Sequence, residues 1–463
     1  MNRTILYLLL VTFITSCQQN DSTNVDTIWI GGEIIAPKSD YIILKKDNQT
    51  IDTILLERDN TFLYKADTLS EGLYTFHHNE YQIMHLTPGD SLLLRVNTYE
   101  FDESLTYSGR GAEKNNFLMD LYLFNEKVNR DMPKLYQLPP REFERELDSI
   151  QLIKTTMLKR FKSNHTINDA FEEVALADIN YGNYLKKELY TSANYRRKET
   201  LDFPASFYDY RDKVNTEKTF LKVYLPYYRF LNAYSDNLAF EKYKASDSFS
   251  RYSYQHSYHK LKTIDSLIKS PVLKNALLEN NVRRYLNRAN NAEEEQEISK
   301  LFLKMDTNKS HQYAIQNLVD ATLKLTPGNK IPDLTLATVD NNAASLAALI
   351  KKPTVLYFWS SQSVNHYKDI HRKAELLQEK FPEYDFIGIN TDTNFRKWRD
   401  LVTALGYDSS QEFQFENIIE AEKQLVLNSA NKTMILDRSG IILTGNTNLF
   451  NPNIEKQLKD FKK

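Results

Sequence analysis

The sequence predicts a multidomain chain with an N-terminal all-β sandwich, a central all-α region and a C-terminal α/β domain. Three patterns predict this order. Short runs rich in Ile, Leu, Tyr and Thr alternate with turn residues over 26–110, and apolar residues recur at helical spacing over 111–324. Over 325–463, continuous apolar runs alternate with amphipathic stretches. The chain has 463 residues, more than one compact core usually holds, so several domains are expected.

The first part, residues 26–110, is predicted to form a small sandwich. Its expected strands are separated by turns rich in Gly, Pro, Asp and Asn, and this spacing is typical of antiparallel sandwiches. The strands are expected at 26–35, 41–46, 50–56, 61–65, 73–77 and 91–96. The glycine-containing run 109–112 is expected to close this domain.

The second part, residues 111–324, is predicted to be helical. Apolar residues follow one stripe of a helix through 139–161, and two prolines stand where the first turn of that helix would lie. Ser270 and Pro271 resemble a helix cap and first helical residue, so another helix is expected over 272–286.

The third part, residues 325–463, is predicted to be a mixed sheet covered by helices on both faces. The run Pro-Thr-Val-Leu-Tyr-Phe-Trp is apolar throughout, as expected of a strand that is buried on both faces. The expected strands are 353–359, 384–390, 432–436 and 441–443, and the expected helices are 366–381 and 398–405.

The N-terminus resembles the signal peptide of a bacterial lipoprotein. Arg3 precedes the apolar stretch 5–14, which is too short to span a bilayer and ends in Ile-Thr-Ser-Cys17. An apolar residue, two small residues and Cys match a lipobox. The resemblance implies a signal peptide over 1–17, acyl chains such as palmitate on Cys17, and a polar tether over 18–25. The alternative is an ordinary secretory signal with an incidental cysteine.

The C-terminal part resembles the thioredoxin-like domain of TlpA-type thiol–disulfide oxidoreductases. The order and spacing of several short motifs carry this resemblance over roughly the last 140 residues. They are Leu-Thr-Pro-Gly-Asn-Lys-Ile-Pro-Asp-Leu at 325–334, Val-Leu-Tyr-Phe-Trp-Ser-Ser at 355–361, Ile-Gly-Ile-Asn-Thr-Asp at 387–392, Trp398, Met-Ile-Leu-Asp at 434–437, and Gly440. The fold class implied for 325–463 is therefore an α/β thioredoxin-like domain.

This chain departs from the family at the reactive positions. The family's Cys-x-x-Cys pair would fall on Ser363 and His366, and its cis-proline would fall on Asn431. A serine hydroxyl has no redox couple and stays protonated, whereas catalysis of thiol exchange needs a thiolate. A cis bond before a non-proline residue costs about 2.5 to 4 kcal/mol, so a trans bond is expected before Asn431.

The remaining residues allow two interpretations. Ser363 is expected to cap the helix that follows. A hydrolytic pair of Ser363 with His366 is disfavoured because no third group that would orient it is evident. Trp359 and Gln362 are candidates for lining a groove. No catalytic residue, metal or cofactor is expected, because the nine histidines are scattered; those such as His371 are expected near the surface.

These observations predict a lipid-anchored protein of the bacterial envelope, on its periplasmic face or on the outer-membrane surface. A redox-inactive thioredoxin-like domain would bind or scaffold a protein or peptide partner. The alternatives are a TlpA-type oxidoreductase, disfavoured because the single cysteine is Cys17, or a surface lipoprotein for nutrient capture. The net charge of -2 gives no reason to expect a nucleic-acid partner.

A further pattern stays open. Tripeptides of Asp, Ser or Thr, and an apolar residue or Thr, such as 52–54, resemble acceptors for O-glycosylation. The same tripeptides also arise by chance in strands, because Thr and Ile are common there.

Overall fold

The computed structural model describes residues 26–195, 201–243, 250–429 and 431–461. The predicted signal peptide, Cys17 and the tether lie outside the described residues. The chain divides into two compact units. One comprises Met1–Val214 and Lys218–Ala233, and the other comprises Asn215–Glu217 and Tyr234–Lys463. The helical region is therefore divided between the units, and each unit is described by itself.

The first unit begins with two four-stranded sheets that share one apolar core. The six predicted strands are present, and β6 and β8 complete the sheets. One sheet has the order β4 (Thr61–Ala66), β1 (Ile28–Ile35), β7 (Ser91–Asn97), β8 (Thr106–Arg110). The other has the order β3 (Gln49–Leu55), β2 (Tyr41–Lys46), β5 (Gly72–His78), β6 (Glu80–Leu86). The sequence prediction of an all-β N-terminal part is confirmed.

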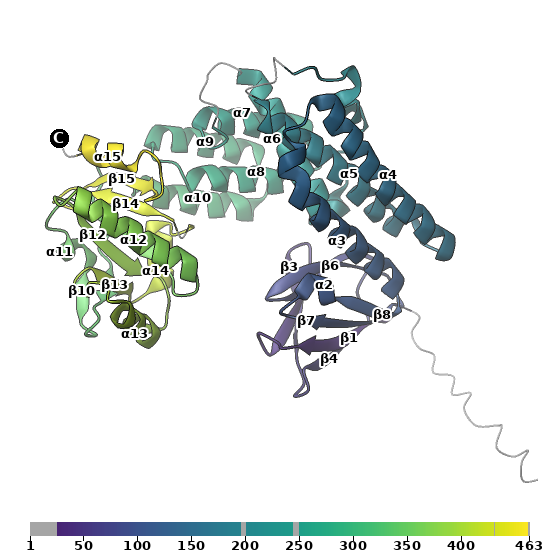
Figure 1. The fold of residues 1–463 in the computed structure, drawn as a ribbon, viewed down its shortest axis with the longest axis horizontal. Coiled ribbons are helices and arrows are strands. Elements are labelled where there is room, and N and C mark those ends of the chain that lie inside the picture. The colour runs from purple at the N-terminus through teal and green to yellow at the C-terminus, as the bar shows by residue number, and fades with distance from the viewer. Residues whose placement is uncertain (1–25, 196–200, 244–249, 430, 462–463) are drawn as a thin grey trace, which may run out of the picture. The chain divides into compact units, whose positions relative to one another are not determined.

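Gly111 joins this sandwich to the first long helix. Its φ of 92° is one that glycine adopts easily, and a Cβ there would lie 2.5 Å from the Asp90 carboxylate. After it, α3 (Ala112–Leu135), α4 (Pro140–Asn164) and α5 (Asp169–Ala193) pack side by side (Figure 1). The helix predicted from the stripe over 139–161 is thus confirmed as α4.

Shorter elements complete the first unit. They are α2 (Phe101–Ser104), the 3₁₀ turns η2 (Ala205–Lys213) and η3 (Thr219–Leu221), and the start of α6 (Leu225–Tyr243).

The second unit contains the rest of α6 and four further helices before its sheet. These are α7 (Tyr254–Leu267), α8 (Pro271–Leu286), α9 (Ala292–Met305) and α10 (Lys309–Leu323). Ser270 caps α8 as predicted, because its side chain accepts a hydrogen bond from the Leu273 amide. No helix in the described ranges combines the length and the apolar character needed to cross a membrane.

A seven-stranded mixed sheet forms the rest of the second unit. Its order is β10 (Ala343–Ser345), β9 (Thr335–Ala337), β13 (Glu412–Phe415), β12 (Asp385–Asn390), β11 (Thr354–Trp359), β14 (Thr433–Leu436), β15 (Ile442–Thr447). β11 is parallel to β12 and antiparallel to β14. All of its residues are buried, which confirms the strand predicted from the apolar run at 353–359.

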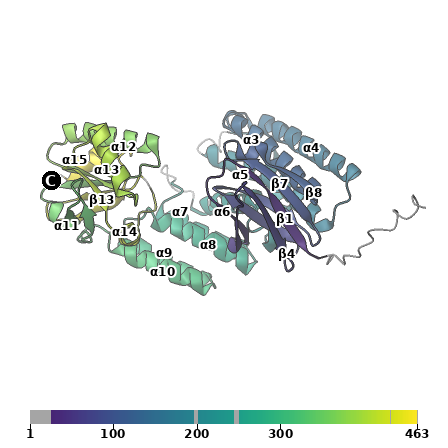
Figure 2. The same cartoon turned by 90° about the horizontal axis from the view of Figure 1, so that it is seen from below.

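Helices cover both faces of this sheet. On one face, α12 (Val364–Lys380), α13 (Phe395–Leu405) and α15 (Ile454–Phe461) pack against alternate residues of β11 (Figure 2). On the other face, α11 (Leu346–Leu349) and α14 (Ile418–Leu425) pack against the remaining ones. Ser363 lies in the loop between β11 and α12, His366 lies in the first turn of α12, and Asn431 lies just before β14.

Candidate functional site

The loop between β11 and α12 is held by Asp392, which follows β12. Ser360 donates from its hydroxyl to Asp392 Oδ1 at 2.5 Å, and the Ser361 amide donates to Oδ2 at 2.7 Å. Burial alone would raise the pKa of Asp392, but these hydrogen bonds outweigh it and lower that pKa. The carboxylate therefore fixes the chain just before the site.

Ser363 occupies the capping position of α12, but its side chain does not cap the helix. It makes no side-chain capping bond, and it is exposed. Only its backbone takes part, since the Tyr367 amide donates to the Ser363 carbonyl at 3.0 Å. The expected side-chain capping role of Ser363 is therefore wrong, because only its backbone carbonyl bonds the first turn.

His366 and Asn431 lie in contact although 65 residues separate them. The Nε2 atom of His366 donates to the Asn431 side-chain oxygen at 2.9 Å. His366 Nδ1 is buried and has no hydrogen-bond partner in the described part of the chain. The peptide bond before Asn431 involves residue 430, which lies outside the described residues; among the described residues no peptide bond is cis.

The hydrolytic pair does not form in this geometry. His366 is bonded to Asn431, and no hydrogen bond joins the Ser363 hydroxyl to His366 or to another described residue. A serine nucleophile needs a base within hydrogen-bond reach, and Ser363 has none there. Within the described ranges, no group of three or more His, Cys, Asp or Glu side chains is arranged to hold a metal ion.

The two groove candidates differ in exposure. Gln362 is exposed, whereas Trp359 is only 1% exposed and its ring points inward. Trp359 Nε1 donates to Glu412 Oε2 at 2.9 Å. Trp359 therefore belongs to the interior beneath the loop, and only Gln362 of the pair is available to a partner.

Glu412 is the centre of a buried polar network that sequence reasoning missed. It is 2% exposed, and its Oε1 accepts from Tyr357 OH at 2.9 Å and from His371 Nε2 at 3.2 Å. Burial first, and the Glu412 charge second, raise the pKa of Tyr357 well above its usual value, so the phenol stays a donor. His371 also stacks on Tyr407, with ring centroids 3.8 Å apart.

The expectation that His371 lies near the surface is wrong, since it is 4% exposed. Nothing local in the sequence indicated its partner, because Glu412 lies 41 residues away and on a strand that the apolar pattern did not predict. The local signal was weak, because Phe413 and Phe415 alternate with polar residues over too few positions to predict a strand.

Comparisons with known proteins give matches to solved structures only. No protein-family model matches the chain, and no curated protein does either. A Bacteroides vulgatus protein assigned as a thiol-disulfide oxidoreductase is 15% identical, with a TM-score of 0.27, over 30% of this chain and 97% of that one. A domain of a possible thiol-disulfide isomerase from Cytophaga hutchinsonii is 16% identical, with a TM-score of 0.27, over 29% of this chain and 92% of that one.

A third solved structure is the thioredoxin domain of a thiol-disulfide oxidoreductase from Bacteroides vulgatus. It is 14% identical, with a TM-score of 0.25, and the match covers 30% of this chain and 99% of that one. Two of these three structures are thus described as thiol-disulfide oxidoreductases and one as a possible thiol-disulfide isomerase. The likeness concerns the fold of that part alone.

Proposed function

We propose that this chain is a lipid-anchored binding protein of the bacterial envelope, whose thioredoxin-like domain holds a protein or peptide partner without dithiol chemistry. One observation carries the proposal. At the positions where the resembled family has its cysteine pair and cis-proline, this chain has Ser363, His366 and Asn431, and His366 is hydrogen-bonded to Asn431 at 2.9 Å.

The chemistry of the loop supports binding over redox catalysis. Disulfide exchange requires a thiolate that attacks a disulfide sulfur, and the only cysteine in the sequence is Cys17. Purified protein should therefore not accelerate the reduction of insulin by dithiothreitol above the buffer rate. Clear turnover would contradict the proposal and favour the oxidoreductase alternative.

The proposed partner surface is the exposed start of α12. Val364 is 51% exposed there, beside the exposed Gln362. An apolar side chain among polar neighbours suits a protein or peptide contact, although a single exposed valine is also common on free surfaces. The test must therefore separate this face of the helix from the rest of it.

A photo-crosslinking residue at Gln362, in the protein in its native membrane, should capture a defined partner. Val364→Asp should remove that cross-link. Leu376→Asp is the matched control, because Leu376 is 57% exposed on the same helix but lies away from the loop. Equal loss with both substitutions, or no loss with either, would show that the start of α12 does not hold the partner.

The proposed anchor is Cys17. Lipidation there, with two or more acyl chains, would suffice for stable attachment to a bilayer. Cys17→Ser should move the protein from the detergent phase to the aqueous phase in a two-phase partition experiment. A variant that stays in the detergent phase would require a second membrane attachment.

A further inference from the structure

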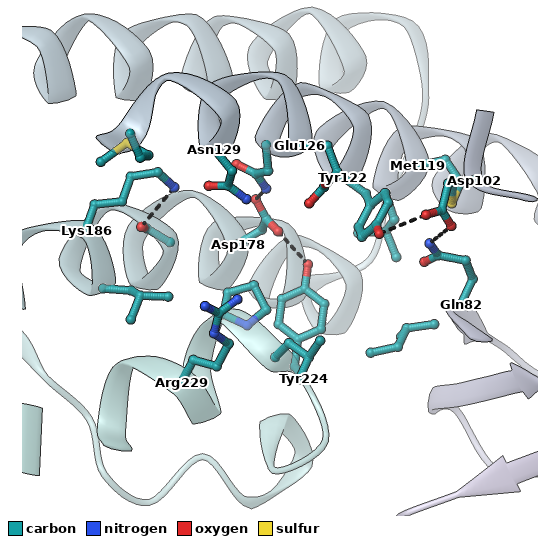
Figure 3. Close-up of a pocket in the computed structure, with 18 of the residues that line it drawn as sticks. Gln82, Asp102, Met119, Tyr122, Glu126, Asn129, Asp178, Lys186, Tyr224 and Arg229 are labelled. Atoms are coloured by element: carbon teal, nitrogen blue, oxygen red, sulfur yellow. Dashed lines mark hydrogen bonds between the residues drawn. The ribbon is translucent and has the colours of Figure 1, made fainter. Parts of the chain in front are cut away.

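The first unit contains a cavity of about 710 Å³, within the usual range for small-molecule sites. Figure 3 shows its walls, which come from α3 and α5, the start of α6, and the β6–α2 side. On α3 the lining residues Tyr122, Glu126 and Asn129 follow helical spacing. On α5, Asp178 and Lys186 do the same, so two facing helical stripes form the cavity.

Lys186 lines this cavity and forms no ion pair with a residue in the described ranges. It is only 7% exposed, and its Nζ has a single long hydrogen bond of 3.5 Å to the Gly182 carbonyl. Its neighbour Lys187 is almost as buried but pairs with Glu144 at 2.6 Å. Burial, followed by repulsion from Lys154, lowers the pKa of Lys186 to about 8.

The carboxylate whose charge acts on Lys186, that of Asp178, already accepts several hydrogen bonds. Asp178 Oδ1 accepts from Lys154 Nζ at 2.9 Å and from Asn125 at 3.0 Å, and its Oδ2 accepts from Tyr224 OH at 3.0 Å. Asp178 therefore balances Lys154 rather than Lys186.

A second cation lines the same cavity. Arg229, at the start of α6, makes no ion pair or hydrogen bond with any described residue. It lies near enough to Lys186 for their charges to repel. Lys186 and Arg229 thus line the cavity with no ion pair to a described residue, so both can pair with the carboxylate of a ligand.

The opposite end of the cavity has the opposite charge. Asp102 accepts from Gln82 Nε2 at 2.6 Å and from Tyr122 OH at 2.9 Å, but no cation pairs with it among the described residues. Each carboxylate oxygen can accept more than one hydrogen bond, so Asp102 can also receive an ammonium group. In Figure 3, Gln82 and Asp102 lie on the far side from Lys186. Apolar side chains such as Leu118 and Leu185 lie in the wall as well.

Helix geometry sets the separation of the two ends. α3 and α5 run in the same direction, because Asn125 contacts Asp178 and, further along, Asn194 contacts Tyr136.

Tyr122, which bonds Asp102, lies three residues before Asn125, about 4.5 Å along the helix. Gly182, whose carbonyl bonds Lys186, lies four residues beyond Asp178, about 6 Å along the helix. The ends are therefore on the order of 10 Å apart, the span of about three extended residues.

We propose that this cavity binds a short apolar peptide with free termini, of about three residues. Its C-terminal carboxylate lies between Lys186 and Arg229, its amino group lies at Asp102, and its side chains contact the apolar wall. This site belongs to the first unit, so it does not depend on the function proposed for the thioredoxin-like domain.

Calorimetry with the full-length protein and trileucine tests the proposal. Trileucine should bind, and both its C-terminal amide and its N-acetyl form should bind about tenfold or more weakly, because each lacks one charge. Failure of trileucine to bind at millimolar concentration, or equal binding of the acid and the amide, would overturn the proposal.

Variants test the end of the cavity that is proposed to bind the carboxylate. Lys186→Met and Arg229→Gln should each weaken trileucine about tenfold but leave the affinity for its amide almost unchanged. Lys127→Met is the matched control, because Lys127 is exposed on α3 and does not line the cavity. If Lys186→Met fails to fold, the exposed Arg229 still decides the outcome. Unchanged trileucine affinity in Arg229→Gln would contradict the assignment.

Discussion

Two buried charges, Glu412 in the second unit and Lys186 in the first, differ in the hydrogen-bond partners that the chain provides for them. Glu412 accepts hydrogen bonds from Tyr357, Trp359 and His371, all from the chain itself. Lys186 is similarly removed from solvent but has only one long bond to a carbonyl. A buried charge with a full set of partners stabilises the fold, whereas one without a counter-ion costs folding free energy and is available to a ligand.

The largest expected effect is a difference in the free energy of unfolding between variants of two lysines, Lys154 and Lys186. Lys154→Met should lower the free energy of unfolding of the first unit by about 3 to 5 kcal/mol, because it leaves the buried Asp178 charge unpaired. Lys186→Met should leave that stability unchanged or raise it by about 1 kcal/mol. The lowered pKa of Lys186 means that keeping the buried lysine protonated costs folding free energy, and methionine removes this cost.

Urea unfolding followed by circular dichroism measures both variants. Because the chain has two units, the transition that changes in Lys154→Met must be identified and used for both. Similar losses for the two lysines would show that Lys186 is a structural residue and would weaken the contrast with Glu412.

The next effect is expected at Glu412. Glu412→Gln keeps the shape but replaces one acceptor oxygen with an amide NH₂ that faces donors, so the second unit should lose about 2 to 3 kcal/mol. Glu416→Gln, on an exposed residue just beyond the same strand, should change stability by less than about 0.5 kcal/mol. Equal values by urea unfolding would mean that the network contributes nothing.

The affinity of the cavity should depend on pH through Lys186. Burial lowers the pKa of Lys186 to about 8, together with the charges of Lys154 on α4 and Arg229 on α6, while Asp178 on α5 opposes this shift. As pH rises from about 7 to 9, Lys186 loses its proton and N-acetyl-trileucine should bind about tenfold more weakly. This probe has no amino group of its own to titrate.

Lys186→Met is the control for this titration, because it should abolish the pH dependence. A pH profile that is the same in the variant and in the unchanged protein would assign the titration to another group.

The smallest effect is expected at the partly exposed bond between His366 and Asn431. A double-mutant cycle with His366→Ala and Asn431→Ala should give a coupling of about 0.5 to 1.5 kcal/mol in the unfolding free energy of the second unit. Additive losses would show that the two side chains do not depend on each other in solution.

Local patterns in the sequence were enough to predict most of the described strands and several of the helices. The apolar run that became β11, the stripe that became α4 and the Ser-Pro start of α8 all encode their structure over a few neighbouring residues. β6 was not among the predicted strands; its turn from β5 uses Asn79 with a φ of 63° and has no Gly or Pro. That strand contributes to the cavity.

The sequence alone also predicted which positions correspond to the reactive residues of the family that the chain resembles. The absence of cysteines at Ser363 and His366, and of proline at 431, follows from residue types at fixed distances from recognisable motifs. Redox chemistry depends on which atoms are present, so residue identity decides it without any knowledge of packing.

Only the tertiary structure decided which charged and polar residues are buried and what they meet. The sequence contains 59 Lys and Arg residues, and nothing in its local pattern distinguishes Lys186 from the paired Lys187 beside it. His371 was likewise expected at the surface and lies buried against Glu412. Helical and strand periods specify which face of an element a residue occupies. Partners that come from distant segments are set by how the elements pack. The electrostatics of a site depends on those partners.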